Sequence, residues 1–445
     1  MGSGVVRPLV NSAETMFTAL AFVYWPWNQP FAAPLTVSAN PSAKASLPLA
    51  LFFAALSCII RPTSAVLWLC AGILLLLNQP RHSRVSRTAF IVTTTLATAA
   101  FALLAMLLID RLGYSQWVFP PYHFYIFNVQ QDLGTWFGES PPLYHLYVSM
   151  PILFTSMLPF VIHGIYICYR TNRVTLEPAF VALSASFLFS LVGHMEYRFL
   201  YPLLPIGFTY AAISIHSLVG PLLSDTTASK KVSKKRKANS NNPGRWSVRN
   251  VLIYLLLTNV PATLYLDLVH QRGVVDVLKY LRTQASSPDN AVSQIGFLMP
   301  CHSTPFYSHL HKDLPMWFLS CEPPLEKDQL PTHYWEANDF EQNPEAFLHK
   351  IFTTTTTTTK SDIEVLQADS MADRDAQDHR GFHNAGPLPG QPRPWPSHLV
   401  LYDVMAKRIG HILVDHGYSE CARFFNTHFN GDSRRKGDVI VYCQH

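Results

Sequence analysis

Long apolar runs fill the first part of the chain and constrain its fold more than any other feature. Residues 1–270 consist mainly of such runs, broken by short polar loops, whereas residues 271–445 have the composition of a water-exposed domain. A helix needs about 20 mainly apolar residues to cross a bilayer. The sequence therefore predicts a mainly α polytopic membrane protein followed by a water-exposed domain. Runs of that length lie near residues 9–26, 48–78, 88–109, 149–168, 175–193, 199–220 and 250–268.

Basic loops between these runs indicate their orientation. The segments RHSRVSR (81–87), YRTNR (169–173) and KKVSKKRK (230–237) each carry several Lys or Arg residues. Short loops rich in Lys and Arg stay in the cytosol, and placing all three there lets the spans alternate without conflict. A nuclear-import signal or a lipid-binding patch is the alternative for 230–237. The loop 110–148, the stretch 194–198 and everything after residue 268 then lie on the non-cytosolic side.

The chain divides into four parts on this basis. We expect a transmembrane bundle at 1–223, a disordered basic cytosolic loop at 224–248, a last transmembrane helix at 249–268 and a C-terminal α/β luminal domain at 269–445. Low-complexity or proline-rich insertions lie within that domain near 353–360 and 369–397. The strand-like runs lie at 290–301, 314–321, 398–403 and 437–443, and the helix-like runs at 344–352 and 403–418.

Four cysteines lie in the predicted luminal domain. An even number on the non-cytosolic side permits disulfides, and the pairs closest in sequence are Cys301–Cys321 and Cys421–Cys443, although three connectivities are open. Three histidines near Cys301 suggest a metal site only weakly, because no further ligand spacing accompanies them, and we expect no metal. The cysteines within or beside spans are predicted to be small apolar fillers: Cys58, Cys70 and Cys168.

Ionisable residues are concentrated at the junction of two predicted spans. The segment HMEYRFLYPLLP (194–205) places His194, Glu196 and Arg198 within five positions. A charged group beside hydrocarbon is costly and indicates function, and Arg is well suited to phosphate. The sequence therefore favours anion binding at a short turn. The alternative is that Glu196 pairs with Arg198 or Arg61 and only holds loops together.

A second unusual stretch is the aromatic loop 110–148. Aromatic residues with polar tips favour the membrane interface, and their rings also stack on sugars. This loop is therefore predicted either to hold a glycan or lipid headgroup or to pack at the interface. Its carboxylates are Asp110, Asp132 and Glu139.

The segment HMEYRFLYPLLP resembles the H-K-E-x-R-F-x-x-P-x-x-P signature of the glycosyltransferase family 22 mannosyltransferases, with Met195 in place of the signature Lys. The stretches IGFLMPCHSTPFYSHLH (295–311) and MWFLSCEPPL (316–325) are similar to the branch of that family that adds the third mannose to the glycosylphosphatidylinositol (GPI) anchor precursor. The similarity runs from about residue 7 to the C-terminus.

The resemblance implies a GT-C-like helical bundle in the endoplasmic reticulum membrane, with the C-terminal domain in the lumen. It implies an α-1,2-mannosyltransferase that inverts the donor linkage, with dolichyl-phosphate mannose as donor and the GPI precursor glycolipid as acceptor. Membrane lipid is an expected partner, and nucleic acid, metals and other cofactors are not. Arg198 and His194 are expected to contact the donor phosphate, Arg61 is a weaker candidate, and Glu196 is expected to orient Arg198.

One part of the family pattern is missing. The family's catalytic carboxylate belongs to an Asp-Glu pair, usually within H-P-D-E, and this chain contains no adjacent Asp-Glu. We therefore expect an N-terminally incomplete sequence, assign no catalytic residue, and predict that this chain alone is inactive. Activity would require another base, for which Asp132 and Glu139 are the candidates.

Four other functions are compatible with parts of the sequence. Two lie within the family: a mannosyltransferase of N-glycan precursor assembly, and the GPI enzyme that adds a fourth mannose. The first should lack the MPCHSTPFYSH stretch. A transporter is disfavoured because the halves show no inverted repeat. A non-catalytic scaffold subunit is the remaining alternative.

Overall fold

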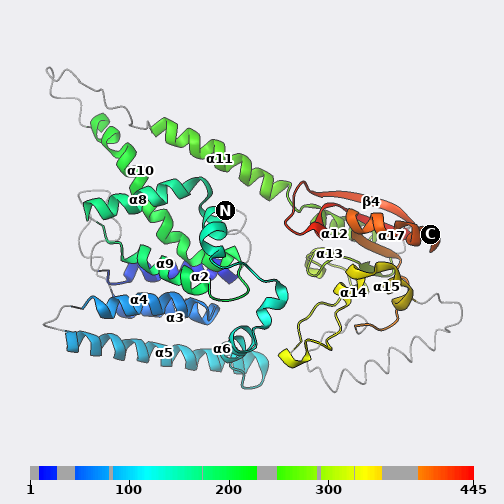
Figure 1. Cartoon of the computed structure of the whole chain (residues 1–445), viewed down its shortest axis with the longest axis horizontal. Coiled ribbons are helices and arrows are strands. Elements are labelled where there is room, and N and C mark those ends of the chain that lie inside the picture. The colour runs from blue at the N-terminus through cyan, green and yellow to red at the C-terminus, as the bar shows by residue number, and fades with distance from the viewer. Residues whose placement is uncertain are drawn as a thin grey trace. The chain divides into compact units, whose positions relative to one another are not determined.

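The computed structural model describes residues 10–27, 46–79, 84–172, 174–227, 248–287, 292–324, 326–352 and 389–445. The chain forms two compact units, Met1–Thr263 and Leu264–His445, each of which is treated by itself (Figure 1). Most of the loop expected at 224–248, and most of the insertions expected near 353–360 and 369–397, lies outside the described residues.

Helices occupy each apolar run of the first unit, which confirms a mainly helical polytopic architecture. The long run at 48–78 forms two helices because Pro62 disfavours helical backbone at the residue before it, and Arg61 is extended (φ −143°, ψ 114°). The α-helices are α2 (Val10–Tyr24), α3 (Leu47–Ile60), α4 (Ser64–Leu77), α5 (Arg84–Tyr114), α6 (Pro120–Tyr125), α7 (Met150–Phe154), α8 (Leu158–Thr171), α9 (Glu177–Phe189), α10 (Leu204–Thr227) and α11 (Val248–Leu268). Short 3₁₀ or π segments lie between them: η2 (Ile126–Gln130), η3 (Leu133–Phe137), η4 (His145–Ser149), η5 (Thr155–Met157) and η6 (Tyr197–Leu203).

Several helical stretches are suited to a bilayer. Within the described ranges, Arg84–Tyr114, His145–Thr171, Tyr197–Val219 and Arg249–Gln284 are long and apolar enough to cross a membrane. Their outer sides expose large apolar groups, such as Phe101 (67%). Such a surface would be unfavourable in water but matches lipid. The chain is therefore a multi-pass membrane protein.

Small residues bring helices of the first unit into close contact. At Gly164 of α8, an added Cβ would lie 1.9 Å from the carbonyl oxygen of Tyr210 on α10. Small residues allow this approach in membrane helices. Tyr210 is fully buried there, and its hydroxyl donates to the Thr175 carbonyl at 2.8 Å.

The second unit is built on a five-stranded sheet of order β2-β1-β3-β5-β4. Strands β2, β1 and β3 are parallel, while β5 runs antiparallel to both β3 and β4. Strand β4 is not among the predicted strands, because its outward positions carry charged Glu420 and Arg423 and weaken the apolar pattern. The strands are β1 (Ile295–Phe297), β2 (Met316–Phe318), β3 (His398–Tyr402), β4 (Tyr418–Thr427) and β5 (Gly437–Gln444).

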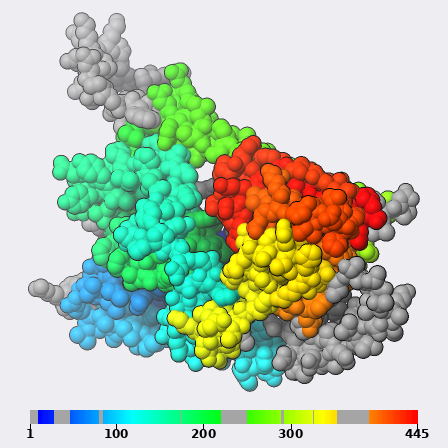
Figure 2. Space-filling model, turned by 45° about the vertical axis from the view of Figure 1, so that its right-hand side comes forward, coloured from blue at the N-terminus to red at the C-terminus, as the bar shows by residue number. Residues whose placement is uncertain are grey.

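Helices cover both faces of this sheet. Leu399 and Leu401 of β3 pack into one core with α14 (Glu336–Gln342), α15 (Pro344–Ile351) and α17 (Asp403–Asp415). Figure 2 shows α15 in yellow beside α17 in orange on that side. Val400 of β3 packs on the opposite face with α12 (Gly273–Gln284) and α13 (Tyr307–Leu310). Coverage on both sides explains why every residue of β3 is buried.

Two disulfides cross-link the second unit. They join Cys301 to Cys321 and Cys421 to Cys443, so the structure selects one of the three connectivities that the sequence left open. The first ties the loop after β1 to the segment that follows β2, and the second joins neighbouring strands β4 and β5. Cys58, Cys70 and Cys168 are unpaired.

Candidate functional site

The signature segment forms a turn followed by 3₁₀ helix η6. The chain leaves α9 at Phe189, and Glu196 is extended (φ −126°, ψ 143°) immediately before η6. Pro202 lies inside η6, where its missing N–H is compatible with the tight turn. The interpretation of 194–198 as a short non-helical turn therefore agrees with the structure up to Glu196.

A segment of the aromatic loop fixes this turn in place. The Ser140 backbone N–H donates to the Gly193 carbonyl at 3.0 Å. The Ser140 hydroxyl donates to the Met195 carbonyl at 3.0 Å, and the Met195 N–H lies 3.3 Å from that hydroxyl oxygen. His194 Nδ1 lies 2.8 Å from the Gly138 carbonyl, which can only accept, so Nδ1 carries the hydrogen. These four contacts hold the two segments side by side.

Glu196 lies between the two candidate cations. Its Oε1 is 2.5 Å from Arg198 Nη2 and 3.4 Å from His194 Nε2. Because His194 Nδ1 already donates to a carbonyl, donation from Nε2 as well requires the imidazolium form. The site therefore holds two cations on one carboxylate oxygen.

The ionisation of this cluster follows from its contacts. The hydrogen bond to Glu196 raises the pKa of His194, which outweighs the lowering effect of burial. Burial by itself would raise the pKa of Glu196, but hydrogen bonds from His194 and Arg198 hold it below its usual value. The Arg198 side chain remains 42% exposed, and its buried Nε has no hydrogen-bond partner within the described residues. Arg198 therefore has donor capacity left for a ligand.

Arg61 approaches the same segment but its charge is paired. Its Nη1 lies 3.2 Å from Oε2 of Glu14, whose side chain is 2% exposed. Ser64 donates to the other oxygen of that carboxylate. The Arg61 guanidinium also lies 5.2 Å from the centroid of the Phe199 ring, next to Arg198 in sequence. The Arg61 guanidinium thus packs against the signature segment at Phe199, while Glu14 offsets its positive charge.

Two polar residues of α2 belong to this neighbourhood and were missed by the sequence reasoning. Glu14 pairs with Arg61, and Asn11 Nδ2 donates to the Arg198 carbonyl at 3.1 Å. Both are at most 5% exposed. The signal was available, because an ionisable residue inside an apolar run is a candidate functional residue by default.

The structure also brings Asp132 to the signature. Asp132 has a left-handed backbone (φ 51°), which is uncommon for a residue other than glycine. A Cβ added at Gly193 would lie 3.6 Å from Asp132 Oδ1 and 2.7 Å from the Thr135 methyl carbon, so only glycine fits there. Glu139 is exposed on the same loop. The aromatic loop therefore brings the Asp132 carboxylate next to Gly193, the residue before His194.

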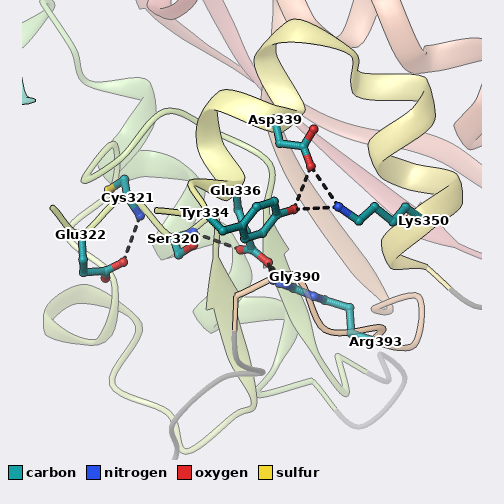
Figure 3. A network of polar contacts seen from close by, with 9 residues as sticks. All are labelled: Ser320, Cys321, Glu322, Tyr334, Glu336, Asp339, Lys350, Gly390 and Arg393. Atoms are coloured by element: carbon teal, nitrogen blue, oxygen red, sulfur yellow. Dashed lines mark hydrogen bonds and ion pairs between the residues drawn. The ribbon is translucent and has the colours of Figure 1, made fainter. Parts of the chain in front are cut away.

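A buried polar network in the second unit has a structural character (Figure 3). Glu336 is 1% exposed; it forms an ion pair with Arg393 and accepts from the backbone N–H groups of Ser320 (3.1 Å) and Gly390 (2.8 Å). The Arg393 guanidinium lies 4.7 Å from the Trp317 ring centroid. Arg393 belongs to the insertion expected near 369–397, yet it is buried. Among the described residues, no three His, Cys, Asp or Glu side chains gather as a metal site.

The apolar helices of the first unit and the cluster of His194, Glu196 and Arg198 define a class of protein: a multi-pass membrane protein with a cationic site at the end of a span. The family model for the Alg9-like mannosyltransferase family matches residues 3–311. The chain belongs to this family, which confirms the resemblance seen in the signature, and it is a mannosyltransferase. Members of such a family use a lipid-linked sugar donor and a glycolipid acceptor.

Several curated proteins are similar over almost the whole chain. GPI mannosyltransferase 3 of Yarrowia lipolytica is 34% identical over 98% of this chain and 72% of its own length. Mannosyltransferase APTG1 of Arabidopsis thaliana is 31% identical over 98% and 68%. GPI alpha-1,2-mannosyltransferase 3 of Mus musculus is 31% identical over 98% and 64%. Apo ArnT from Cupriavidus metallidurans matches 97% of this chain and 72% of its own length at 12% identity, with a TM-score of 0.35.

Proposed function

We propose that this chain is an α-1,2-mannosyltransferase that adds the third mannose to the GPI anchor precursor, with dolichyl-phosphate mannose as donor. The observation that carries the proposal is the Glu196-centred pair of cations at the start of the apolar stretch Tyr197–Val219. A lipid phosphate has its charge at the membrane surface, where this cluster lies if η6 begins the span. The names of the similar proteins favour this function over N-glycan assembly, a fourth GPI mannose or a transporter.

The proposed reaction is a single displacement with inversion. An acceptor hydroxyl attacks C1 of mannose, the bond from C1 to the phosphate oxygen breaks, and dolichyl phosphate leaves with the electron pair. Arg198 and His194 stabilise the charge that develops on that phosphate, so we propose no metal or other cofactor. The hydroxyl proton passes to a base. We assign no residue to that role, for which Asp132 and Glu139 are the loop candidates.

The proposed function also assigns a cellular location to each unit of the chain. The first unit forms a GT-C-like bundle in the endoplasmic reticulum membrane, and the second unit lies in the lumen. Basic loops at 81–87 and 169–173 support this orientation by the preference of Lys and Arg for the cytosol. The third basic segment, 230–237, lies outside the described residues.

Lipid analysis of cells that lack this gene distinguishes the candidate functions. Accumulation of a GPI intermediate with two mannoses is expected, because the acceptor of the third mannose would no longer be consumed. A truncated N-glycan precursor would instead assign the chain to the sister enzyme. A GPI intermediate with three mannoses would assign it to the fourth transfer.

Replacement of Arg198 tests the phosphate contact. For Arg198→Ala we expect the Kd for the donor, measured by binding without turnover, to rise roughly 10- to 100-fold, the equivalent of about 1.5–3 kcal/mol for a hydrogen bond to a charged group. Arg198→Lys should recover part of the loss, because it restores the charge but not the planar fork. The control is Arg111→Ala, which removes a cation that lies over the Trp117 ring at the end of α5. An unchanged donor Kd in Arg198→Ala would contradict the assignment.

A further inference from the structure

The end of helix α11 gives the second unit a reference level in the membrane. Between Arg249 and Asp267 the helix carries no charged residue, and those 17 residues rise about 26 Å at 1.5 Å each, close to the hydrocarbon thickness. Large side chains such as Leu256 (59%) and Leu257 (69%) are exposed along it. The last turn, up to Leu268, therefore lies at the boundary between hydrocarbon and headgroups.

The hairpin tip between β4 and β5 is bound to that last turn. The Gln271 N–H donates to the Asn426 carbonyl at 2.8 Å, and the Tyr265 hydroxyl lies 2.9 Å from His428 Nδ1. The Phe429 ring stacks on Tyr265 with centroids 5.6 Å apart and remains 58% exposed. Aromatic rings at a span end are typical of the membrane interface. The tip therefore lies at the headgroup level.

The strand register places one whole edge of the sheet at that level. Strand β5 begins at Gly437 beside the tip, and its Val439 pairs with Tyr402, the last residue of β3. Val400 of β3 pairs with Phe297, the last residue of β1, and Phe297 pairs with Phe318, the last residue of β2. The carboxyl ends of the three parallel strands thus face the membrane together with the tip. Ligands commonly bind beyond the carboxyl ends of strands in open α/β sheets.

A cavity of about 100 Å³ lies at this edge, several times the ~10–15 Å³ that one water needs. It is open to solvent, since Phe318 is 39% exposed and His302 is also exposed. Neither the His302 imidazole nor the Thr304 hydroxyl has a hydrogen-bond partner within the described residues. No Lys, Arg, Asp or Glu lines the cavity. Its lining includes Phe297, Phe306, Phe318, His302, Ser303 and Thr304.

The loop that forms the cavity is held rigidly. Its Cys301 is disulfide-bonded to Cys321, and the Cys301 carbonyl accepts from Arg435 Nη2 at 2.8 Å. His302 and Phe306 have positive φ angles of 54° and 52°. Such conformations are costly and persist where the surroundings impose them, often at ligand sites. A loop fixed in this way is pre-organised for binding.

We propose that this cavity binds the neutral hexose head group of a membrane glycolipid. Apolar ring faces suit the C–H face of a pyranose, and the imidazole and hydroxyl groups suit its hydroxyls, whereas the uncharged lining does not suit a phosphate. The proposal rests on the proposed function in one respect, that the glycolipid head group is mannosylated. The stretch MPCHSTPF, which takes no part in the proposed contacts to the donor phosphate, then binds the acceptor glycolipid.

The orientation is tested with one environment-sensitive label in lipid vesicles. The full chain, with its three unpaired cysteines replaced by alanine, carries the label at Phe429→Cys or at Val414→Cys. Val414 is similarly exposed (63%) but lies near the end of α17, at the opposite sheet edge. Brominated lipid is expected to quench the label at 429 and not at 414. Equal quenching at both positions, or none at 429, would overturn the membrane-facing edge.

Sugar binding is tested without catalysis, by saturation-transfer NMR between the full chain in nanodiscs and methyl α-mannobioside. Transfer to the sugar protons is expected for the wild type and for the control Val414→Ala. It should be lost in Phe318→Ala and reduced in His302→Ala, whose side chain is exposed. Absence of transfer in the wild type, or its persistence in Phe318→Ala, would overturn the proposal. Because no turnover is needed, this result is independent of the proposed function: a truncated N-glycan precursor in cells that lack the gene would argue against that function without affecting sugar binding here.

Discussion

Glu196 should set the pH range in which the donor phosphate is bound. Its Oε1 contacts both His194 and Arg198, so the isosteric change Glu196→Gln removes one charge and leaves the shape of the turn. The contact to Glu196 is the largest cause of the raised pKa of His194. Without it, the pKa of His194 falls toward its usual value, and the imidazole loses its proton at a lower pH.

The size of the expected loss of donor affinity follows from the exposure of the Glu196–Arg198 ion pair. The Arg198 and Glu196 side chains are 42% and 32% exposed, so solvent screens their contact, and its loss costs at most about 1 kcal/mol, or about fivefold in the donor Kd. At a pH between the His194 pKa of the variant and that of the wild type, only the wild-type imidazole is protonated, and the variant then also lacks one cation at the phosphate. We expect a further loss of about tenfold, or about 1.4 kcal/mol.

The direction of the His194 pKa shift determines how donor binding changes with pH. His194 is charged below its raised pKa, so the donor Kd should be low there and rise as pH increases through that pKa. In Glu196→Gln the rise should begin at lower pH. Glu196 itself stays ionised throughout, because its own pKa is lowered.

The assay is the donor Kd from about pH 5.5 to 9, measured by binding without turnover, with competition by inorganic phosphate as a second readout. The control is Glu345→Gln, which removes an exposed His–Glu contact of similar length, 3.5 Å from His411. A pH profile for Glu196→Gln that coincides with the wild type would refute the reasoning, because it would mean that Glu196 does not control the charge of His194.

Two stability predictions concern other parts of the chain. Glu336→Gln leaves Arg393 charged and buried, which should lower the free energy of unfolding by about 3–5 kcal/mol. The control Arg408→Met breaks a half-exposed pair and should lower it by less than about 1 kcal/mol. Guanidinium unfolding followed by tryptophan fluorescence compares the two variants. Gly164→Val should destabilise the first unit in thermal unfolding in detergent, because α8 and α10 have no room for a side chain, whereas nothing lies within 4 Å of a Cβ at Gly72, so Gly72→Val is the control. Equal midpoints within either pair would contradict the corresponding argument.

Much of the helical part could be predicted, because the bilayer imposes length and hydropathy on each span. The runs near 88–109 and 250–268 form α5 and α11 with small changes at their ends. The break inside 48–78 was visible as Arg-Pro-Thr, and whether one bent helix or two resulted depended on packing. Strand β4 was not predicted because it is an edge strand with charged residues on its exposed side. Its local pattern of apolar and polar residues therefore resembles that of a loop.

The site was predictable in composition and not in arrangement. The sequence alone singled out His194, Glu196 and Arg198, since ionisable groups beside apolar runs are conspicuous. Their sharing of one carboxylate oxygen depends on the turn geometry set by Ser140, which lies more than fifty residues earlier.

Sequence by itself determined the membrane class, the family and the identity of the cationic residues, because hydropathy and a compact signature are local properties of the chain. Only the tertiary structure decided that Glu14 offsets Arg61, that Asp132 lies beside Gly193, and that three strand ends share one edge with the tip near Phe429. Those relations join residues far apart in the chain, and no local preference encodes a distance between such residues.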